Sequence, residues 1–518
     1  YLNGDTTAMP AYKFDYNISQ SLPARFSYAQ DVYGYYNGKT TNTSIYPAPQ
    51  GYSVSYTFSD RSIDTNYTRL GTLKQVKYPT GGTLNIETEN NRDAVELVGG
   101  LRIKRIINTD SVTGKQLVTE YKYQFENGAP SGALLYKPKF YYDYTYMGCG
   151  TSEESRIKVV GSSIHPLSAN QGSAISYDEV EKSEIGDSYN LKSRHSFVNY
   201  LNVGAETPNS AHLGDPNGVP FPKMTNLNNY NGIEYSTKVY QYKNGQYYKI
   251  NETQKDYKTL NQFQKYIWNV QAAWGGFTHA FIYDACNGNP YNWDPMFPRP
   301  LINPYKFFSE TLVENSTTSE TKDDNNNTLT QFARKEYDHT NGNLKKTITV
   351  NSKGDTLRTY YKYSCDYPWT SSTNPVNVEL VYLAEQNIIL PVEIISTIQK
   401  AGSATETVRQ GQLYTYTNGR VKKLYQFTKE IALAGMLQSY VNNSGFYYDA
   451  NYQQEEEINT YNSDNNPVEI TSRAQKKSFI WDKNNIMASA ADASYTDIAA
   501  TSFEPDAKGN WSYSGTPV

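Results

Sequence analysis

The sequence predicts an all-β fold, a continuous strip of antiparallel β-hairpins, and three observations support this prediction. Short runs rich in Tyr, Thr, Val and Ile, which suit a pleated and half-buried surface, recur along nearly the whole chain. The runs are bounded by Gly, Asn, Asp and Pro, which are turn residues. Asn-Gly pairs occur nine times in the 518 residues, whereas the composition predicts about three. Because both residues tolerate positive φ, Asn-Gly closes a two-residue hairpin with the twist that strands need.

Several hairpins can be placed by residue number. The expected hairpin units span residues 73–87, 101–125, 233–257 and 337–363. Three turns also predict which residues face each other across the hairpin. Around Asn244-Gly245 the expected pairs are Tyr242 with Tyr247 and Val239 with Ile250. Around Asn418-Gly419 they are Tyr416 with Val421 and Leu413 with Leu424, and around Asn341-Gly342 Asp338 faces Lys345.

Helical periodicity is scarce, and we expect only short helices at residues 431–440 and 487–493. Loop-like breaks are expected near 148–155, 208–223 and 287–304, with a further turn at 323–327. The prolines between residues 290 and 300 exclude a central strand there, because proline cannot donate to the ladder. None of the breaks has the composition of an interdomain linker. We therefore expect one hairpin strip over residues 1–500, followed by the start of another β module at 501–518.

Composition excludes several classes of function. The formal net charge of −4 gives no basic footprint for nucleic acid or anionic lipid. Apolar residues make up 38% of the chain, but 49 of them are Tyr; without Tyr about 29% remain, so tyrosine rings must supply much of the buried area. No apolar run approaches the roughly 18 residues that span a bilayer. We expect no cofactor, no nucleic acid and no membrane span.

The sequence also contains no catalytic or metal-binding motif with the usual local spacing. Cys149, Cys286 and Cys365 lie far apart without a CxxC pair, which excludes a disulfide scaffold and a thiolate zinc site of the usual spacing. His279 and Cys286 are seven residues apart, so in a strand they point to opposite faces and cannot act as base and nucleophile. The other histidines are remote from one another, namely His165, His195, His212 and His339.

Acidic clusters at 323–327 and 464–466 offer oxygen ligands suited to Ca²⁺, but neither fits the twelve-residue calcium loop, and both are interpreted as hairpin tips. We assign no catalytic, cofactor-binding or metal-binding residue. One set of side chains is a candidate binding surface, because indole rings beside Gly, Pro or Asn in loops can contact glycans or partner proteins. These residues are Trp274, Trp293, Trp369 and Trp511.

Longer strings of residues carry a family resemblance. Tyr337-Asp338, followed by Gly342-Asn343-Leu344 and the Tyr-rich run 360–363, resembles one YD repeat of the RHS/YD-repeat superfamily. The segments 414–421 and 461–470 resemble degenerate copies. Five further strings, in the same order, resemble the large Bacteroidota branch of that superfamily. They lie at residues 27–38, 78–82, 98–104, 480–482 and 500–511. Most units lack the literal Tyr-Asp, and Asp482 stands where that branch often has Gly-Tyr.

The resemblance implies a structural role. Proteins of this superfamily wind a strip of hairpins into a hollow shell, and many carry a variable C-terminal toxin or effector that the shell encloses or presents. Relatives in the branch are exported to the cell surface, often by a type IX route. The motif Asp215-Pro216-Asn217-Gly218 resembles the DPxG of the self-cleaving core found in toxin-bearing members, but its companions are missing and it is a good turn sequence.

We therefore expect a non-enzymatic segment of a secreted surface protein, and an internal piece of a longer polypeptide. Its expected partners are a downstream effector of the same polypeptide, together with secretion machinery or other surface proteins. The alternative is a surface adhesin or glycan-binding β module in which the tryptophan loops carry the binding.

Overall fold

The structure is a computed structural model, and it describes residues 11–49, 55–135, 137–147, 153–163, 172–187, 189–199, 230–260, 266–274, 300–308, 311–368, 373–482, 485–500 and 510–511. The chain forms two compact units, Tyr1–Leu329 and Thr330–Val518. The described part of both units is dominated by antiparallel strands, which confirms the predicted fold class.

Among the strands in the described part of the first unit lies the short helix α1 (Thr65–Thr68). The strands are β1 (Lys13–Tyr16), β2 (Leu73–Lys77), β3 (Thr83–Arg92), β4 (Leu97–Thr109), β5 (Gln116–Lys122), β6 (Gly132–Leu134), β7 (Tyr141–Met147), β8 (Glu153–Val159), β9 (Ile175–Tyr177), β10 (Glu179–Gly186), β11 (Tyr189–Val198), β12 (Ile233–Lys243), β13 (Gln246–Thr259), β14 (Tyr266–Trp274), β15 (Pro300–Phe308) and β16 (Leu312–Lys322).

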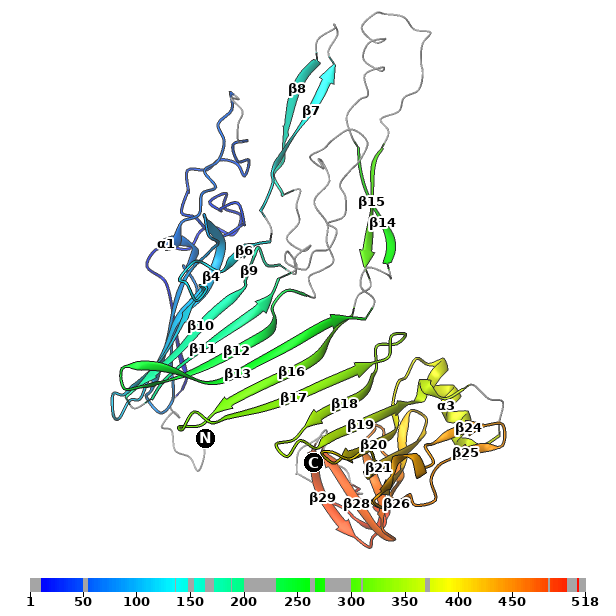
Figure 1. Cartoon of the computed structure of the whole chain (residues 1–518). Coiled ribbons are helices and arrows are strands. Elements are labelled where there is room, and N and C mark those ends of the chain that lie inside the picture. Colours follow the sequence, from blue (N-terminus) through cyan, green and yellow to red (C-terminus); the bar gives the residue numbers. More distant parts are fainter. Residues whose placement is uncertain are drawn as a thin grey trace, which may run out of the picture. The chain divides into compact units, whose positions relative to one another are not determined.

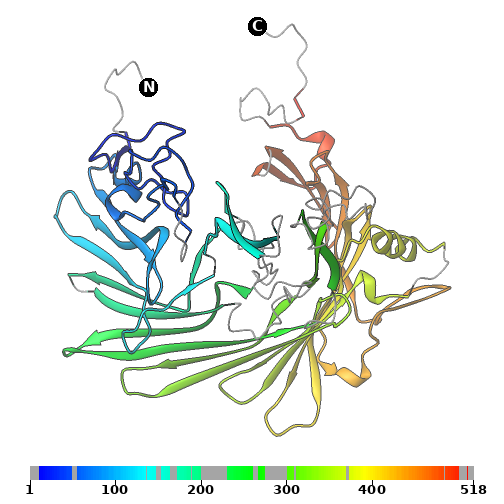
Figure 2. The same ribbon diagram turned by 90° about the horizontal axis from the view of Figure 1, so that it is seen from above.

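Most of these strands follow one another edge to edge in chain order. The pairing runs β1–β2–β3–β4–β5–β10–β11–β12–β13–β16, and every step is antiparallel. In Figure 1, β10 to β13 lie side by side, and Figure 2 shows the same hairpins from another direction. The remaining strands form two-stranded ribbons, namely β6–β9, β7–β8 and β14–β15.

The expected breaks have different outcomes. The break near 148–155 overlaps the beginning of β8 at Glu153, and 208–223 lies outside the described residues. Of 287–304, the last five residues belong to β15, whose partner is β14 alone. Proline is tolerated there because a ribbon edge needs no donor at every position.

The predicted hairpin registers are correct for the pairs next to the turns. For pairs farther from the turns they are wrong by one residue. Tyr242 pairs with Tyr247 and Tyr416 with Val421, as predicted. Val239, however, pairs with Asn251 rather than Ile250, and Leu413 pairs with Tyr425 rather than Leu424. A β-bulge lies between the turn and the misplaced pair in both hairpins, and one extra residue shifts all later pairs by one position.

The second unit continues the same architecture. Its strands are β17 (Thr328–Tyr337), β18 (Leu344–Val350), β19 (Thr356–Tyr363), β20 (Pro391–Gln399), β21 (Glu406–Thr417), β22 (Arg420–Phe427), β23 (Ile431–Ala432), β24 (Tyr440–Asn442), β25 (Gly445–Tyr447), β26 (Gln453–Tyr461), β27 (Pro467–Ser472), β28 (Gln475–Asp482) and β29 (Asn485–Ala491). Its helices are η4 (Ser364–Asp366), α3 (Pro375–Glu385), η5 (Leu433–Gly435) and η6 (Tyr495–Asp497).

The strands of the second unit also pair in chain order. The order is β17–β18–β19–β20–β21–β22–β26–β27–β28–β29. β23 pairs with β21, and β24 pairs with β25 in a separate hairpin.

The helices of this unit are not where the sequence predicts them. The expected helix at 431–440 is instead β23, the single 3-10 turn η5 and the start of β24, and the expected helix at 487–493 is mostly strand β29. α3, which was not predicted, begins after Asn374, whose side chain accepts hydrogen bonds from the backbone amides of Val376 and Asn377. Pro375 occupies its first turn, where the missing N–H costs nothing.

A hydrophobic core is formed in the second unit, between α3, the central strands β20 to β22 and the β24–β25 hairpin. Its fully buried members include Leu383, Val392, Val408, Leu413 and Phe427. In the described part of the first unit the largest buried apolar cluster is small, with Val98, Ala174 and Ile175 at its centre.

A carboxylate is buried within the core of the second unit. Glu393 on β20 is only 2% exposed, and it accepts hydrogen bonds from the backbone N and the Oγ of Ser439, at 2.9 and 2.6 Å, and from the hydroxyl of Tyr452 at 2.9 Å. The Lys362 ammonium donates to the carbonyl oxygen of Ser439, and burial lowers the pKa of this lysine. Burial, reinforced by Glu393, raises the pKa of Tyr452, so its phenol stays a donor. This Glu393 network therefore fixes the segment before β24 against the sheet.

We expect Glu393→Gln to lower the free energy of unfolding of the second unit by about 2–5 kcal/mol, because an amide nitrogen would face one of the three donors. Glu430→Gln is the matched control, since Glu430 is exposed and pairs only at the surface with Arg409; it should change stability by less than about 1 kcal/mol. Urea unfolding followed by hydrogen exchange of β20 measures both. Equal effects of the two substitutions would show that the network contributes nothing special.

Candidate functional site

Of the four tryptophans predicted as a binding surface, the structure describes only part. Trp511 is 51% exposed, beside Asn510, whose amide donates to the carbonyl oxygens of Tyr495 and Ile498. Trp274 ends strand β14, and Trp293 and Trp369 lie outside the described residues. Their shared role as a binding surface stays a prediction. Exposed Trp268 on β14, which the sequence analysis passed over, is a further indole of this kind.

The other residues singled out from the sequence are separate as well. Cys149, Cys286 and His279 lie outside the described residues, and Cys365 is an exposed free thiol. The described residues contain no group of three or more His, Cys, Asp or Glu side chains that could hold a metal ion. Within the same residues, no helix has the length and apolar character needed to cross a membrane.

Cross-strand pairing instead gathers charged side chains on one face of the first unit's sheet. Directly paired residues share a face, and two rows cross it. The first row is Glu87, Arg105, Glu120, Ser183, Lys192, Tyr240 and Lys249. The second row is Lys122, Glu181, Arg194, Lys238, Glu252 and Glu320. We call these two rows the charged face.

Arg194 is the best-buried cation of the charged face. Its side chain is 9% exposed, and it donates to Glu181 at 2.6 Å and also to Glu179. Lys192 lies 4.4 Å from the ring centroid of Tyr247 and 3.8 Å from the carboxylate of Glu181. Ion pairs and cation–π contacts thus perform the cross-strand role that apolar side chains perform in a sheet with a core.

The opposite face of these strands carries hydroxyl and amide groups. Its rows include Lys182, Ser193, Val239, Asn251 and Thr321, and next to them Val180, His195, Thr237, Thr253 and Ser319. Asn251 donates to the Thr321 hydroxyl at 3.0 Å, and the hydroxyls of Thr253 and Ser319 are 3.2 Å apart. We call this side the hydroxyl face.

His195 on the hydroxyl face has two side-chain partners. Its Nε2 is 2.8 Å from the Oγ of Ser193, and its Nδ1 is 2.5 Å from an oxygen of Glu234 on β12. The sequence analysis missed this cluster. The alternation of Ser193 and His195 was a signal, because residues two apart in a strand share a face, but the partner on β12 required knowledge of the pairing.

Two strings that carry the family resemblance meet in space. Tyr33 and Tyr35, from the string at 27–38, pack on Gly99 and Gly100, from the string at 98–104. A Cβ at Gly99 would lie 2.3 Å from the Cβ of Tyr33, and one at Gly100 would lie 2.9 Å from the hydroxyl of Tyr35. The glycines are therefore required so that the tyrosines can approach β4.

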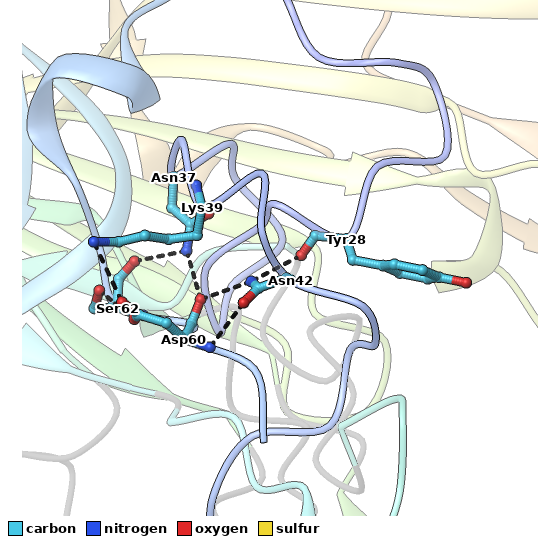
Figure 3. A network of polar contacts seen from close by, with 6 residues as sticks. All are labelled: Tyr28, Asn37, Lys39, Asn42, Asp60 and Ser62. Carbon is cyan, nitrogen blue, oxygen red and sulfur yellow. Dashed lines mark hydrogen bonds and ion pairs between the residues drawn. The ribbon is translucent and has the colours of Figure 1, made fainter. Parts of the chain in front are cut away.

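The same N-terminal segment is held by a polar network (Figure 3). The Asn37 amide donates to the carbonyl oxygens of Asp60 and Ser62, at 3.1 and 3.0 Å. Asn42 donates to the carbonyl oxygen of Asp60 at 2.9 Å, and Lys39 pairs with the Asp60 carboxylate at 3.2 Å. These contacts close a loop structure without regular strands, using backbone oxygens that a sheet would otherwise satisfy.

The aspartate of the Tyr337-Asp338 unit is a turn cap. Asp338 accepts hydrogen bonds from the backbone amides of Thr340 and Asn341, at 2.7 and 3.1 Å, and these bonds lower its pKa. Lys345 lies 3.7 Å from the same carboxylate, but the predicted register is wrong here, because the backbone N–H of Asp338 donates to Asn343 and Tyr337 pairs with Leu344, so Lys345 is not the cross-strand partner of Asp338. Gly342 has positive φ but Asn341 does not, so this turn differs from those at Asn244 and Asn418, where both residues have positive φ.

Comparison with known proteins yields structural likeness only at low similarity. No protein-family profile and no curated protein matches the chain. The chain is similar to a crystal structure of TcdB2-TccC3-Cdc42, with 8% identity and a TM-score of 0.41 over 82% of this chain and 22% of that one. It is also similar to TcdB2-TccC3-TEV, with 9% identity and a TM-score of 0.40 over 81% of this chain and 22% of that one.

A third structure, TcdB2-TccC3 without the hypervariable C-terminal region, has 9% identity and a TM-score of 0.36 over 87% of this chain and 25% of that one. The chain thus spans a quarter or less of the length of these structures.

We expect Gly99→Ala to destabilise β3 and β4 by about 1–3 kcal/mol, because the added Cβ overlaps the Tyr33 side chain. Gly435→Ala is the control, since a Cβ there meets nothing within 4 Å, and it should stay within about 0.5 kcal/mol of the parent protein. Urea-dependent hydrogen exchange of the β3 and β4 amides measures the first, and that of β21 the second. Tolerance of Gly99→Ala would mean that the tyrosines do not need this approach.

Asp338 predicts a pH dependence. Its pKa is lower in the folded than in the unfolded chain, so its stabilising contribution is complete above the unfolded value, near 3.8, and is lost as the pH falls through the folded value. Asp338→Asn should therefore cost about 1 kcal/mol or less at pH 7, and this cost should shrink as the pH falls below about 3.8. Urea titrations at several pH values measure this.

Proposed function

We propose that this chain is a structural segment of a large secreted surface protein, where it forms part of a β shell that encloses or presents a downstream effector or toxin of the same polypeptide. The observation that carries the proposal is the unbroken edge-to-edge pairing of hairpins in chain order within each unit. Paired edges protect backbone groups that would otherwise aggregate, so a strip of this kind can be extended into a wall.

The side chains of the first unit are consistent with a β-sheet wall that contacts water on both faces. The charged face is bound together by Arg194 and its acidic partners, and the hydroxyl face by side-chain amides and hydroxyls. A sheet covered by an apolar layer would instead alternate hydrophobic and polar residues. Two polar faces suit a boundary between an interior compartment and the surrounding water.

The strings that resemble the RHS/YD-repeat superfamily support the same role. Two of them form one packed unit at Gly99 and Tyr33, and the Tyr-Asp unit supplies the turn cap Asp338. By that resemblance the protein is exported to the cell surface, its partners are the enclosed effector and the export machinery, and the wall role requires no turnover of a substrate.

The test uses the natural polypeptide that contains this chain. Intact mass and C-terminal peptide mapping establish whether a segment follows Val518, and limited proteolysis establishes whether that segment is protected. We expect a downstream domain that resists protease in the native protein and is digested after unfolding in guanidinium. A three-dimensional map of the particle should contain a cavity occupied by that domain.

A charge reversal makes the test specific to the wall. Arg194→Glu places three carboxylates together on the charged face, so we expect digestion of the enclosed domain to become at least tenfold faster. Arg473→Glu is the control, because Arg473 pairs with Glu455 at an exposed position, and it should leave protection unchanged. A polypeptide that ends near Val518, or a downstream domain digested as fast as in isolation, would overturn the proposal.

In that outcome the adhesin alternative gains, with Trp511 as the described indole to examine. Glycan binding that is lost in Trp511→Ala would then define the function.

A further inference from the structure

Ser193, His195 and Glu234 form a hydrogen-bonded chain of nucleophile, base and acid on the hydroxyl face. Ser193 and His195 lie two residues apart on β11 and so share a face, and Glu234 comes from the neighbouring strand β12. The distances are 2.8 Å from Ser193 Oγ to His195 Nε2 and 2.5 Å from His195 Nδ1 to Glu234 Oε1. The first distance lies within the range of about 2.6–3.2 Å that a nucleophile and its base require, and the second is a short contact between the base and the acid that orients it.

The chemistry of the partners fixes the direction of both hydrogen bonds. An ionised carboxylate only accepts hydrogen bonds, so Nδ1 of His195 must carry the proton that is donated to Glu234. In the neutral imidazole Nε2 then has a lone pair, and the Ser193 hydroxyl donates to it. This arrangement is the one in which a histidine can remove the proton of a serine hydroxyl.

Glu234 is held in the state and position that this role needs. Burial raises the pKa of the Glu234 carboxyl, but hydrogen bonds from His195 and Thr237, with the charge of Lys255, outweigh burial and hold the pKa below its ordinary value. The Tyr257 hydroxyl also donates to the backbone carbonyl oxygen of Glu234 at 3.1 Å. The acid is therefore ionised at neutral pH and anchored from β13.

The Ser193, His195 and Glu234 side chains are accessible to a molecule in solution. The side chains of His195 and Glu234 are 28% and 33% exposed, and Ser193 is half-buried. Lys182 is the direct cross-strand neighbour of Ser193 on β10, which puts their Cβ atoms about 5 Å apart. Its ammonium pairs with Glu184 at 2.6 Å, and from this cross-strand position the flexible lysine side chain can reach a carbonyl oxygen that reacts at Ser193, where negative charge would develop.

We propose that Ser193 is an activated nucleophile that accepts acyl groups from activated esters, with His195 as its base, Glu234 as the positioning residue and Lys182 as the partner of the oxyanion. Ser193 Oγ attacks the ester carbonyl carbon while its proton passes to His195 Nε2. The carbon–oxygen bond to the alcohol breaks, the alcohol leaves with that proton, and Ser193 carries the acyl group.

Water, deprotonated by His195, then attacks the acyl-serine. The carboxylic acid is released and Ser193 regains its proton, so no further reactant is needed. This activity goes beyond the wall role, and neither proposal depends on the other.

The test is covalent labelling of the whole chain with an alkyl fluorophosphonate, in which Ser193 Oγ displaces fluoride from phosphorus, followed by peptide mass spectrometry. We expect the label on Ser193, at a rate at least tenfold above that of Ser196, which lies on the same strand but faces the other way. Ser193→Ala should abolish this label. Ser196→Ala should leave it unchanged.

His195→Gln should slow labelling of Ser193 at least tenfold, and p-nitrophenyl acetate should acylate Ser193 in the parent protein but not in this variant. Glu234→Gln should slow labelling and Glu234→Asp should restore part of the rate, a rescue that a merely structural role would not produce. Thermal unfolding shows whether each variant is folded. An unlabelled Ser193, or equal labelling in folded His195→Gln and in the parent protein, would overturn the proposal.

Discussion

The hydrogen-bond ladder between consecutive strands is the constraint on which the rest of this structure depends. In the first unit, each strand from β2 to β13 along the main pairing order has a partner on either side, and the described apolar cluster is small. The ladder leaves the side chains to secure the register, and they do so through charge on one face and through hydroxyls and amides on the other. A strand with a polar pattern on both faces is prone to slip, so pairs such as Arg194 with Glu181 have a structural purpose beyond their individual energies.

The second unit meets the same constraint differently. Its central strands have a core beneath them, and the core contains one polar network, at Glu393, in which the groups nearest the carboxylate are donors aimed at it. A buried carboxylate whose hydrogen bonds are all satisfied lowers stability little. It also specifies one packing arrangement of the core, because its hydrogen bonds are directional and apolar contacts are not. The segment before β24 is followed by only a short strand. The Glu393 network therefore fixes the position of this segment against the sheet.

The sequence was sufficient for the fold class and for the pairs beside the Asn-Gly turns, because these depend on local conformational preferences. The sequence-based predictions were wrong where the local structure depends on pairing with strands elsewhere in the chain. The bulge that moved Leu413 from Leu424 to Tyr425 has no local signature, and the 431–440 segment became strand and 3-10 turn because β21 and β25 offered it pairing. α3 was missed although Asn374 and Pro375 are good start signals, since its apolar residues are spread around the helix and do not form a clear stripe on one face.

The same distinction applies to the candidate site. Ser193 and His195 alternate visibly, but Glu234 joins them only through the register of β11 with β12. Of the tryptophans chosen from loop composition, Trp511 is exposed and Trp274 ends strand β14, and their joint role in binding stays a prediction.

The frequent bulges have a consequence for how such a chain changes over generations. Register shifts occur within hairpin after hairpin, among them β12–β13, β21–β22 and β28–β29. A hairpin with such a bulge contains the register shift within itself, so the gain or loss of a whole hairpin would preserve the antiparallel order and the facing of its neighbours. Unequal recombination between similar hairpins could therefore lengthen or shorten the strip in whole steps, so that its size adapts without redesign of the strands that remain.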